Sequence, residues 1–189
     1  MAVESPLTPL GLALGDRSLP DSSGVNHPLR QVGAAATLIA FVCNHCPYVR
    51  HIETALGDLV RSHTEKGLMA LAVVSNDLVE YPDDDIEGME AQLVRANWDF
   101  PYLIDRDQSL ALELGAVCTP DFFLFDSGFH LVYRGAFDDS SPKNGNPVTG
   151  ELLKTAIELT LGGKQVPTPH RSATGCGIKW SPGNEPPAA

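Results

Sequence analysis

Two apolar segments separated by an amphipathic one constrain the fold of this chain more than any other feature. Residues 36–42 and 68–74 are almost continuously aliphatic, β-branched or aromatic, a composition typical of central strands covered on both faces. Between them, apolar side chains recur at helical spacing from Val49 to Val60, and Gly67 ends that segment. A strand, a helix and a second strand in this order form a βαβ unit with parallel strands. The sequence therefore predicts an α/β fold.

The rest of the chain supplies further elements of the same kind. The three acids Asp83–Asp85 precede a helical pattern, and we interpret them as charges that complement a helix dipole rather than as a metal site. Asp107 is the expected cap of another short helix. The segments predicted from periodicity and turn residues are strands at 100–104, 121–125 and 130–134, and helices near 86–97, 108–114 and 150–161.

The two ends of the chain differ from its middle. Residues 1–34 are rich in Gly, Pro, Ser and Asp and predict short strands and turns. Residues 164–189 are Pro-rich and irregular, but they contain Ile178 and Trp180, which we expect to pack on the rest of the protein. We therefore predict one domain over residues 1–163, with an N-terminal strand extension, and a Pro/Gly-rich tail over residues 164–189 that packs on it. The sequence assigns no role to Cys176 in this tail.

Charge and cysteine content exclude several classes of partner and stabilisation. Lys plus Arg total 13 and Asp plus Glu total 24, a net charge of −11, which argues against nucleic acid or an anionic membrane as a partner. No apolar run approaches the roughly 20 residues of a membrane helix. The start Met1–Pro6 lacks the features of a signal peptide, so we expect a cytoplasmic protein. Four cysteines are too few to staple a chain of 189 residues and need another explanation.

The pattern Cys43-Asn44-His45-Cys46 lies where the first apolar strand gives way to its helix. In α/β sheets, functional sites form beyond the carboxyl ends of the parallel strands. A thiol at a helix N-terminus faces unpaired amides and the positive end of the dipole, which stabilise its thiolate. We expect Cys43 to be the exposed nucleophile and Cys46 the buried resolving thiol. Between them, Asn44 belongs to the same site, and His45 would stabilise the thiolate further and make the disulfide more oxidising.

Two further segments are candidates for the same site. Asn76 and Asp77 end the second parallel strand, on the sheet edge that carries Cys43. Asp77 could accept the proton of Cys46, Asn76 could orient the site, or both could be ordinary turn formers. Cys118 precedes the strand at 121–125 and is either a third redox thiol or, as we favour, a small buried residue.

The chain resembles a family of bacterial thiol-disulfide isomerase and thioredoxin-like proteins related to the redoxin and AhpC/TSA group. The resemblance covers residues 19–186 and rests on the segments 41–49, 75–77, 81–82, 118–121, 175–180 and 182–186. It implies a thioredoxin-like three-layer α/β/α fold with a mixed sheet of four or five strands. It also implies that Pro120 is cis and packs against the two cysteines, and that the backbone of Thr119 is free to pair with a substrate strand. The chain departs from thioredoxin in having Val42 in place of tryptophan, and Asn-His in place of Gly-Pro.

These observations predict a thiol-disulfide oxidoreductase that serves cell redox homeostasis and antioxidant activity. Its substrates would be protein or small-molecule disulfides. No Gly-rich dinucleotide motif is present, so we expect no cofactor beyond the Cys43–Cys46 disulfide and an external thiol as reductant. We expect a reduction potential less negative than the roughly −270 mV of thioredoxin.

Two alternatives stay open. A peroxiredoxin-like thiol peroxidase is disfavoured because Ala36 and Ala40 stand where the proline and the hydroxyl residue are expected before Cys43. A non-catalytic metal-binding or interaction module is disfavoured because a zinc site usually needs a second cysteine pair. We therefore expect no metal. The sequence leaves the oligomeric state open.

Overall fold

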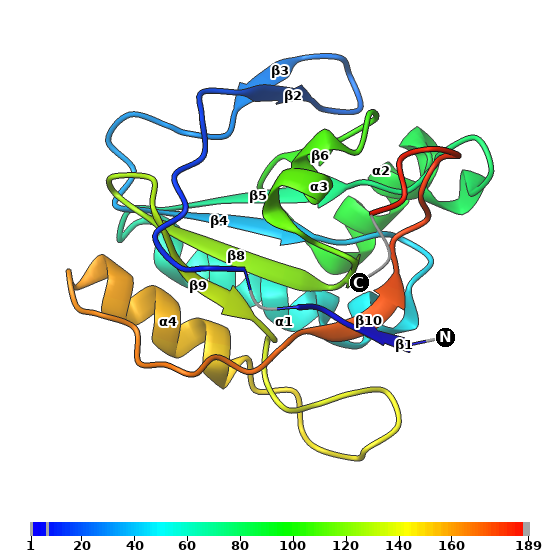
Figure 1. Ribbon diagram of the computed structural model, residues 1–189. Coiled ribbons are helices and arrows are strands. Elements are labelled where there is room, and N and C mark those ends of the chain that lie inside the picture. The colour runs from blue at the N-terminus through cyan, green and yellow to red at the C-terminus, as the bar shows by residue number, and fades with distance from the viewer. Residues whose placement is uncertain (1, 7, 187–189) are drawn as a thin grey trace.

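A five-stranded mixed sheet forms the centre of the protein (Figure 1), whose computed structural model describes residues 2–6 and 8–186. The strand order is β6-β5-β4-β8-β9. Strands β4, β5 and β6 run parallel, whereas β8 is antiparallel to both of its neighbours. The bounds are β4 Ala36–Phe41, β5 Leu68–Val74, β6 Tyr102–Ile104, β8 Asp121–Asp126 and β9 Leu131–Gly135. The predicted mixed sheet is confirmed and has five strands.

Helices cover both faces of this sheet, so the three-layer α/β/α architecture is also confirmed (Figure 1). One core cluster joins the sheet to α1, α2 and α4, and a second cluster joins the opposite face to α3 and the N-terminal segment. The bounds are α1 Pro47–Thr64, α2 Ile86–Ala96, α3 Ser109–Leu114 and α4 Glu151–Leu161, with a 3-10 turn, η1, at Pro82–Asp84. Among the described residues, no helix is both long and apolar enough to cross a membrane.

The helix starts follow local sequence, with one correction. Asp85 is the N-cap of α2, and its carboxylate accepts a hydrogen bond from the Gly88 amide at 3.1 Å. For α3, the expected cap Asp107 is wrong, because the N-cap is Gln108; the Asp107 carboxylate accepts a hydrogen bond from the amide of Ser109, the first residue of α3. The buried Asp105 instead accepts hydrogen bonds from amides in the first turn of α3.

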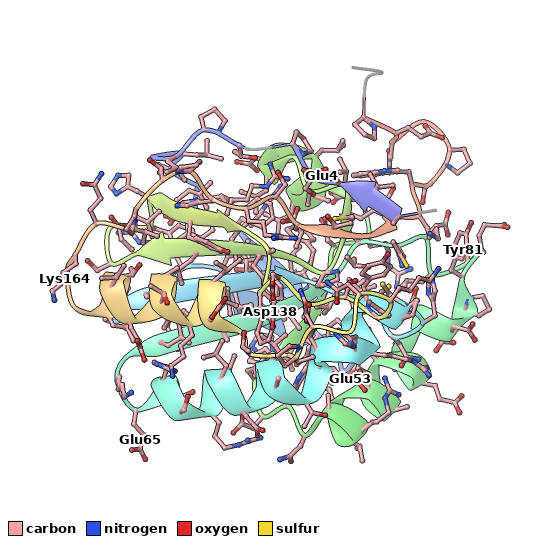
Figure 2. The ribbon with its side chains drawn as sticks, turned by 90° about the horizontal axis from the view of Figure 1, so that it is seen from below. Glu4, Glu53, Glu65, Tyr81, Asp138 and Lys164 are labelled. Atoms are coloured by element: carbon pink, nitrogen blue, oxygen red, sulfur yellow. The ribbon has the colours of Figure 1, made fainter. Side chains whose placement is uncertain are left out.

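A second, smaller sheet brings the two ends of the chain together. Its order is β1-β10-β7, with bounds β1 Ala2–Glu4, β7 Cys118–Thr119 and β10 Thr174–Gly177, and both pairings are antiparallel. Figure 2 shows β1, near Glu4, running beside the C-terminal strand. A separate hairpin pairs β2 (Ser18–Pro20) with β3 (Asn26–Pro28). The division of the chain at residue 163 stays a prediction.

Candidate active site around Cys43 and Cys46

The two cysteines of the CxxC sequence lie just beyond the carboxyl end of β4. Cys46 is the N-cap of α1, and Pro47 occupies the first helical position, where its missing N–H costs least. Both cysteines are free thiols. Cys43 is 1% exposed and Cys46 is 0% exposed. The expectation of an exposed Cys43 is therefore wrong, and the cause lies in the strands packed over it.

Thr119 contacts both sulfur atoms. Its hydroxyl is hydrogen-bonded to Cys43 Sγ at 3.3 Å, and its carbonyl oxygen accepts a hydrogen bond from the Cys46 thiol at 3.2 Å. The peptide bond from Thr119 to Pro120 is cis, as the resemblance implied. The residues before Pro120 thus hold the dithiol from the side opposite to α1.

The backbone of Thr119 is not free, contrary to expectation. In the pairing of β10 with β7, Cys176 lies opposite Thr119 and Gly177 lies opposite Cys118. A Cβ atom on Gly175 would overlap the Thr119 carbonyl oxygen, so this close approach requires glycine there. The chain's own tail therefore occupies the strand position that we had expected a substrate to take.

The interaction between the two thiols makes one of their two protons easy to lose. The hydrogen bond from the Cys43 thiol, followed by contacts to Cys176, Thr119 and the Val49 amide, lowers the pKa of Cys46 to about 5 against the opposing effect of burial. The same hydrogen bond, burial and the carboxylate of Asp84 raise the pKa of Cys43. These opposite shifts place one thiolate on the pair, and the expectation that Cys43 carries it stays a prediction. In such a coupled pair, the titration belongs to both sulfurs.

His45 is held by a buried carboxylate that the sequence did not single out. Asp84 Oδ2 lies 2.6 Å from His45 Nδ1, and Asp84 Oδ1 accepts the His45 amide at 3.0 Å. Asp84 is fully buried, unlike its neighbours Asp83 and Asp85. The helix-dipole interpretation therefore holds for Asp85, the cap of α2, but not for Asp84. Three consecutive acids gave no signal to tell which one turns inward.

Asn44 points away from the sulfur atoms and fixes the loop to α2. Its side chain donates to the Asp83 carbonyl oxygen at 2.7 Å and accepts from the Arg95 guanidinium at 2.8 Å. Arg95 also binds the carboxylate of Glu53, a nearly buried residue of α1 labelled in Figure 2. Asn44 thus has a structural role: through Arg95 it connects the CxxC loop to α2 and, by way of Glu53, to α1.

Asn76 and Asp77 separate into two roles. Asn76 donates a hydrogen bond to Asp84 Oδ2 at 2.7 Å and accepts one from the Lys179 amide at 2.8 Å, so it connects Asp84 to the tail. Asp77 accepts a hydrogen bond from the Ser181 hydroxyl at 2.8 Å, which lowers its pKa, and bonds the amides of its own turn. Its described contacts join it to the tail and not to Cys46.

The remaining cysteines lie close by in different settings. Cys118 is fully buried and 3.4 Å from the Ser5 hydroxyl. Burial, followed by the charge of Asp121, raises its pKa to about 12, as suits a small buried residue. Cys176 is partly exposed and packs against the core cluster that contains both active-site cysteines, and the nearby Cys46 thiol adds to the effect of burial in raising its pKa. Sequence reasoning missed this contact because nothing local in the tail points to it.

One group of side chains among the described residues could hold a metal ion. Atoms of Cys43, His45 and Asp84 lie within 4.8 Å of one another. Three donors of this kind match the protein ligands of an open zinc site. The short hydrogen bond between His45 and Asp84 also occupies two of these donors without any ion.

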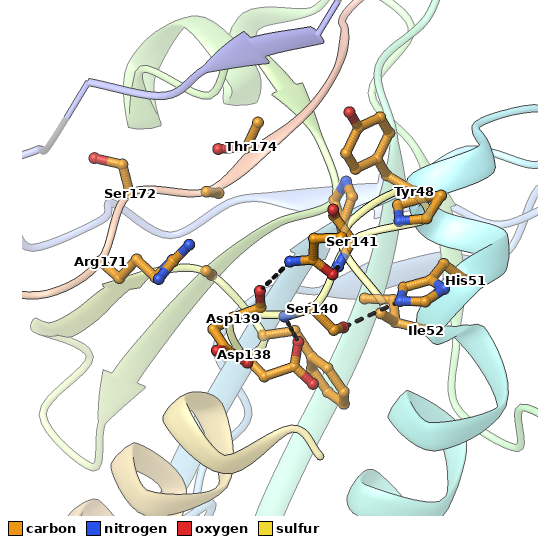
Figure 3. Close-up of a pocket in the computed structure, with 16 residues that line it drawn as sticks. Tyr48, His51, Ile52, Asp138, Asp139, Ser140, Ser141, Arg171, Ser172 and Thr174 are labelled. Atoms are coloured by element: carbon orange, nitrogen blue, oxygen red, sulfur yellow. Dashed lines mark hydrogen bonds between the residues drawn. The ribbon is translucent and has the colours of Figure 1, made fainter. Parts of the chain in front are cut away.

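A pocket lies against Pro120 (Figure 3). It has a volume of about 180 Å³. Tyr48 and His51 of α1 line one side, and the segment Arg171–Thr174 that leads into β10 lines the other. The His51 ring is 3.1 Å from the Ser140 hydroxyl across the pocket. This pocket offers polar and cationic groups next to Pro120, which directly follows Thr119.

Comparison with known proteins identifies the family of this chain. The model of the AhpC/TSA family matches residues 10–134. The chain belongs to the AhpC/TSA family. A search of curated protein sequences finds no match. Family membership, together with the thioredoxin-like fold, supports a redox function and identifies the chain as an oxidoreductase of this family.

Solved structures similar to this AhpC/TSA family member fall into two groups. A hypothetical protein from Sinorhizobium meliloti is 40% identical, with a TM-score of 0.91, and the match covers 95% of this chain and 99% of that one. An uncharacterized conserved protein from Geobacillus kaustophilus is 42% identical, with a TM-score of 0.91 and coverage of 96% and 97%. A thiol:disulfide interchange protein of the thioredoxin family from Chlorobium tepidum is 11% identical, with a TM-score of 0.61 and coverage of 83% and 100%. The last likeness is one of fold alone.

Proposed function

We propose that this protein is a dithiol thiol-disulfide oxidoreductase that reduces or exchanges disulfides through Cys43 and Cys46. The observation that carries the proposal is the arrangement of two free, adjacent thiols at the N-terminus of α1, one of which lowers the pKa of the other. Both are also held by Thr119. Because the pKa of Cys46 is lowered to about 5, the pair carries a thiolate at neutral pH.

The proposed reaction has two exchange steps. The Cys43 thiolate, formed when its proton passes to Cys46, attacks one sulfur of a substrate disulfide, and the other substrate sulfur leaves as a thiolate. Cys46, after losing its proton, then attacks Cys43 in the mixed disulfide. The Cys43–Cys46 bond forms, the bond to the substrate breaks, and the substrate leaves fully reduced. Cys46 suits the second role because Cys43, Thr119 and Cys176 enclose it.

Substrate and reductant follow from the chemistry of the site. We propose disulfides of proteins or small molecules as substrates, an external thiol as the reductant, and no cofactor beyond the dithiol itself. The net charge of −11 suits a cytoplasmic protein without nucleic-acid partners. The pocket beside Pro120 would receive the substrate segment next to the reacting disulfide.

Paired serine variants test the order of attack. Cys46→Ser should retain a nucleophile that cannot resolve, so covalent protein adducts should accumulate in cells and collapse on reduction in a non-reducing gel. Cys43→Ser should give few adducts, and both variants should lose insulin-type disulfide reductase activity. Adducts on Cys43→Ser alone would reverse the two roles. Absence of adducts in both, with an inactive wild-type protein, would refute the proposed function.

Peroxide is the second candidate substrate, because the AhpC/TSA family match favours it. Ala36 and Ala40 provide neither a hydroxyl nor a proline ring before Cys43, and the nearest hydroxyl to Cys43 Sγ is that of Thr119. Stopped-flow mixing of the reduced protein with hydrogen peroxide separates the two functions. We expect oxidation as slow as that of a free thiol, and fast oxidation would favour the peroxidase.

Metal binding is a third candidate function, because donor atoms of Cys43, His45 and Asp84 lie close together. We expect freshly purified protein to contain no stoichiometric metal. Stoichiometric zinc that is lost in Cys43→Ser would favour a metal-binding module over the oxidoreductase.

A further inference from the structure

Cys176 gives the site a third thiol, although it lies far from the CxxC sequence. Strand β10 places it directly opposite Thr119 of β7, and Thr119 contacts both active-site sulfurs. The Cys176 side chain packs against the core cluster that contains Cys46, and it lies close enough to Cys46 for that thiol to raise its pKa. Cys46 therefore has two thiols as neighbours, those of Cys43 and Cys176.

The strand that carries Cys176 is bound as an extended peptide ligand would be. Extended peptides bind to exposed sheet edges through main-chain hydrogen bonds, with side chains supplying specificity. Strand β10 pairs in this way with β7, immediately before the cis peptide bond, and Gly175 permits the close approach. A cysteine at this position of a bound strand is placed to react with the dithiol.

We propose that Cys176 is a third redox-active cysteine. It replaces Cys43 as the disulfide partner of Cys46 and so moves the disulfide from Cys43–Cys46 to Cys46–Cys176. The proposal rests on the proposed function for its oxidant, which is the substrate disulfide whose reduction oxidises the Cys43–Cys46 pair. Its outcome is an oxidised protein in which Cys43 is again a thiol.

The exchange requires no further co-reactant. The Cys176 thiolate attacks Sγ of Cys46, the Cys46–Cys176 bond forms and the Cys43–Cys46 bond breaks, and Cys43 leaves as a thiolate. The proton released by Cys176 ends on Cys43 through solvent. No net electrons are gained or lost, because one disulfide replaces another.

The charge on Cys46 determines when Cys176 can ionise and attack. In the reduced protein, burial first, and then the hydrogen bond and charge of Cys46, raise the pKa of Cys176 to about 12, so its thiolate is scarce. Once Cys46 is bonded to Cys43, it carries no charge and no longer opposes ionisation of Cys176. The ammonium of Lys179, which lowers the pKa of Cys176, remains. The attacking thiolate is therefore favoured only after Cys43 and Cys46 are oxidised.

Disulfide mapping of the intact protein tests the proposal. Cys43→Ser, oxidised with glutathione disulfide and quenched in acid, should form an intramolecular Cys46–Cys176 disulfide, identified by mass spectrometry of the linked peptides. Wild-type protein treated with limiting glutathione disulfide should yield two disulfide isomers, Cys43–Cys46 and Cys46–Cys176. Because the wild-type measurement needs no substitution, it stands even if a variant folds poorly.

Control variants separate the possible results. Cys43→Ser/Cys118→Ser should retain the Cys46–Cys176 disulfide, whereas Cys43→Ser/Cys176→Ser should form none. Glutathione adducts alone on Cys46 in Cys43→Ser, together with only Cys43–Cys46 in the wild type, would overturn the proposal while leaving the proposed function intact. Failure of the wild-type protein to reduce insulin, with the Cys46–Cys176 bond present, would refute the function instead.

Discussion

Two polar side chains that are 2.6 Å apart, His45 and Asp84, set the electrostatics beside Cys43. The carboxylate raises the pKa of Cys43, and the imidazole opposes it when protonated. Stabilising the reduced thiolate makes a dithiol pair more oxidising. The two residues should therefore tune the reduction potential in opposite directions.

Substitutions of His45 and Asp84 should shift the reduction potential in opposite directions. His45→Ala leaves the buried carboxylate uncompensated and should make the potential more negative, whereas Asp84→Asn should make it less negative. Each shift should be tens of millivolts, since roughly 30 mV corresponds to 1.4 kcal/mol for a two-electron couple. Equilibration with glutathione, followed by quantification of free thiols, measures both. Shifts of the same sign would contradict this assignment of charges.

The residue scale also marks a limit of sequence interpretation. The placement of Cys43 and Cys46 at the start of α1 could be predicted, because strand and helix periodicity fix it locally. The burial of Asp84 could not, since three adjacent acids have the same chemistry. Only the packing of η1 against the CxxC loop decides which of them faces His45.

Among the elements, β10 pairs with β7 beside the dithiol, and we expect it to control access to the two thiols. Gly175→Ala should push this strand away from β7, because the added methyl group overlaps the Thr119 carbonyl oxygen. We expect alkylation of the active-site cysteines to accelerate several-fold, and the amide of Ile178, which bonds the Val117 carbonyl oxygen, to exchange faster. Mass spectrometry after timed labelling measures both effects.

Gly177→Ala is the matched control in the same strand. Its added methyl group would meet a Val3 side-chain carbon at 3.3 Å and the Val117 carbonyl oxygen at 3.9 Å, contacts that a small side-chain movement accommodates. Labelling rates should stay near those of the wild type. Equal acceleration in both variants would mean that the close approach at Gly175 does not control access.

Among the helices and strands, those specified by local sequence patterns could be predicted, whereas the pairing of strands far apart in the chain could not. Strands β4 and β5, helix α1 and the β8–β9 hairpin follow from runs of apolar residues and turn signals. Strand β10 has the sequence Thr-Gly-Cys-Gly, which carries no alternation of apolar and polar residues. Its partners β1 and β7 are short and far away in the chain. Their pairing depends on the finished tertiary structure.

For the molecule as a whole, one buried ion pair joins several parts of the chain. Arg134 of β9 is 3.1 Å from Asp121 of β8, and both are buried. Arg134 also binds Thr8 and the Gly115 carbonyl oxygen, while Asp121 accepts the Ser5 hydroxyl at 2.6 Å. This cluster ties the N-terminal segment and the end of α3 to the sheet.

Breaking this pair should destabilise the protein strongly. Arg134→Met leaves the Asp121 carboxylate buried without its cation, which should lower the free energy of unfolding by about 3 kcal/mol or more. Urea denaturation at neutral pH measures this loss. Asp121→Asn/Arg134→Met should recover part of it, because no buried charge remains. A double variant less stable than Arg134→Met would contradict this explanation.

The same pair should give the stability a distinct dependence on pH. Burial raises the pKa of Asp121 from 3.8 to about 6 even with Arg134 present. The folded state then binds more protons than the unfolded state between these values. This contribution to stability is complete below 3.8 and is lost as the pH rises through about 6. Asp121→Asn should abolish it, which denaturation curves from pH 4 to pH 7 can measure; an unchanged slope in that variant would rule out Asp121 as the cause.

The antiparallel pairing of β10 with both β1 and β7 also sets an order of events during protein synthesis. A ribosome releases Cys43, Cys46 and their parallel strands long before Thr174–Gly177 emerge. Throughout that interval the nascent chain presents its two reactive sulfurs without their cover, and the first strand has no neighbour. The newly made protein is thus most open to thiol chemistry before Thr174–Gly177 emerge and close the site.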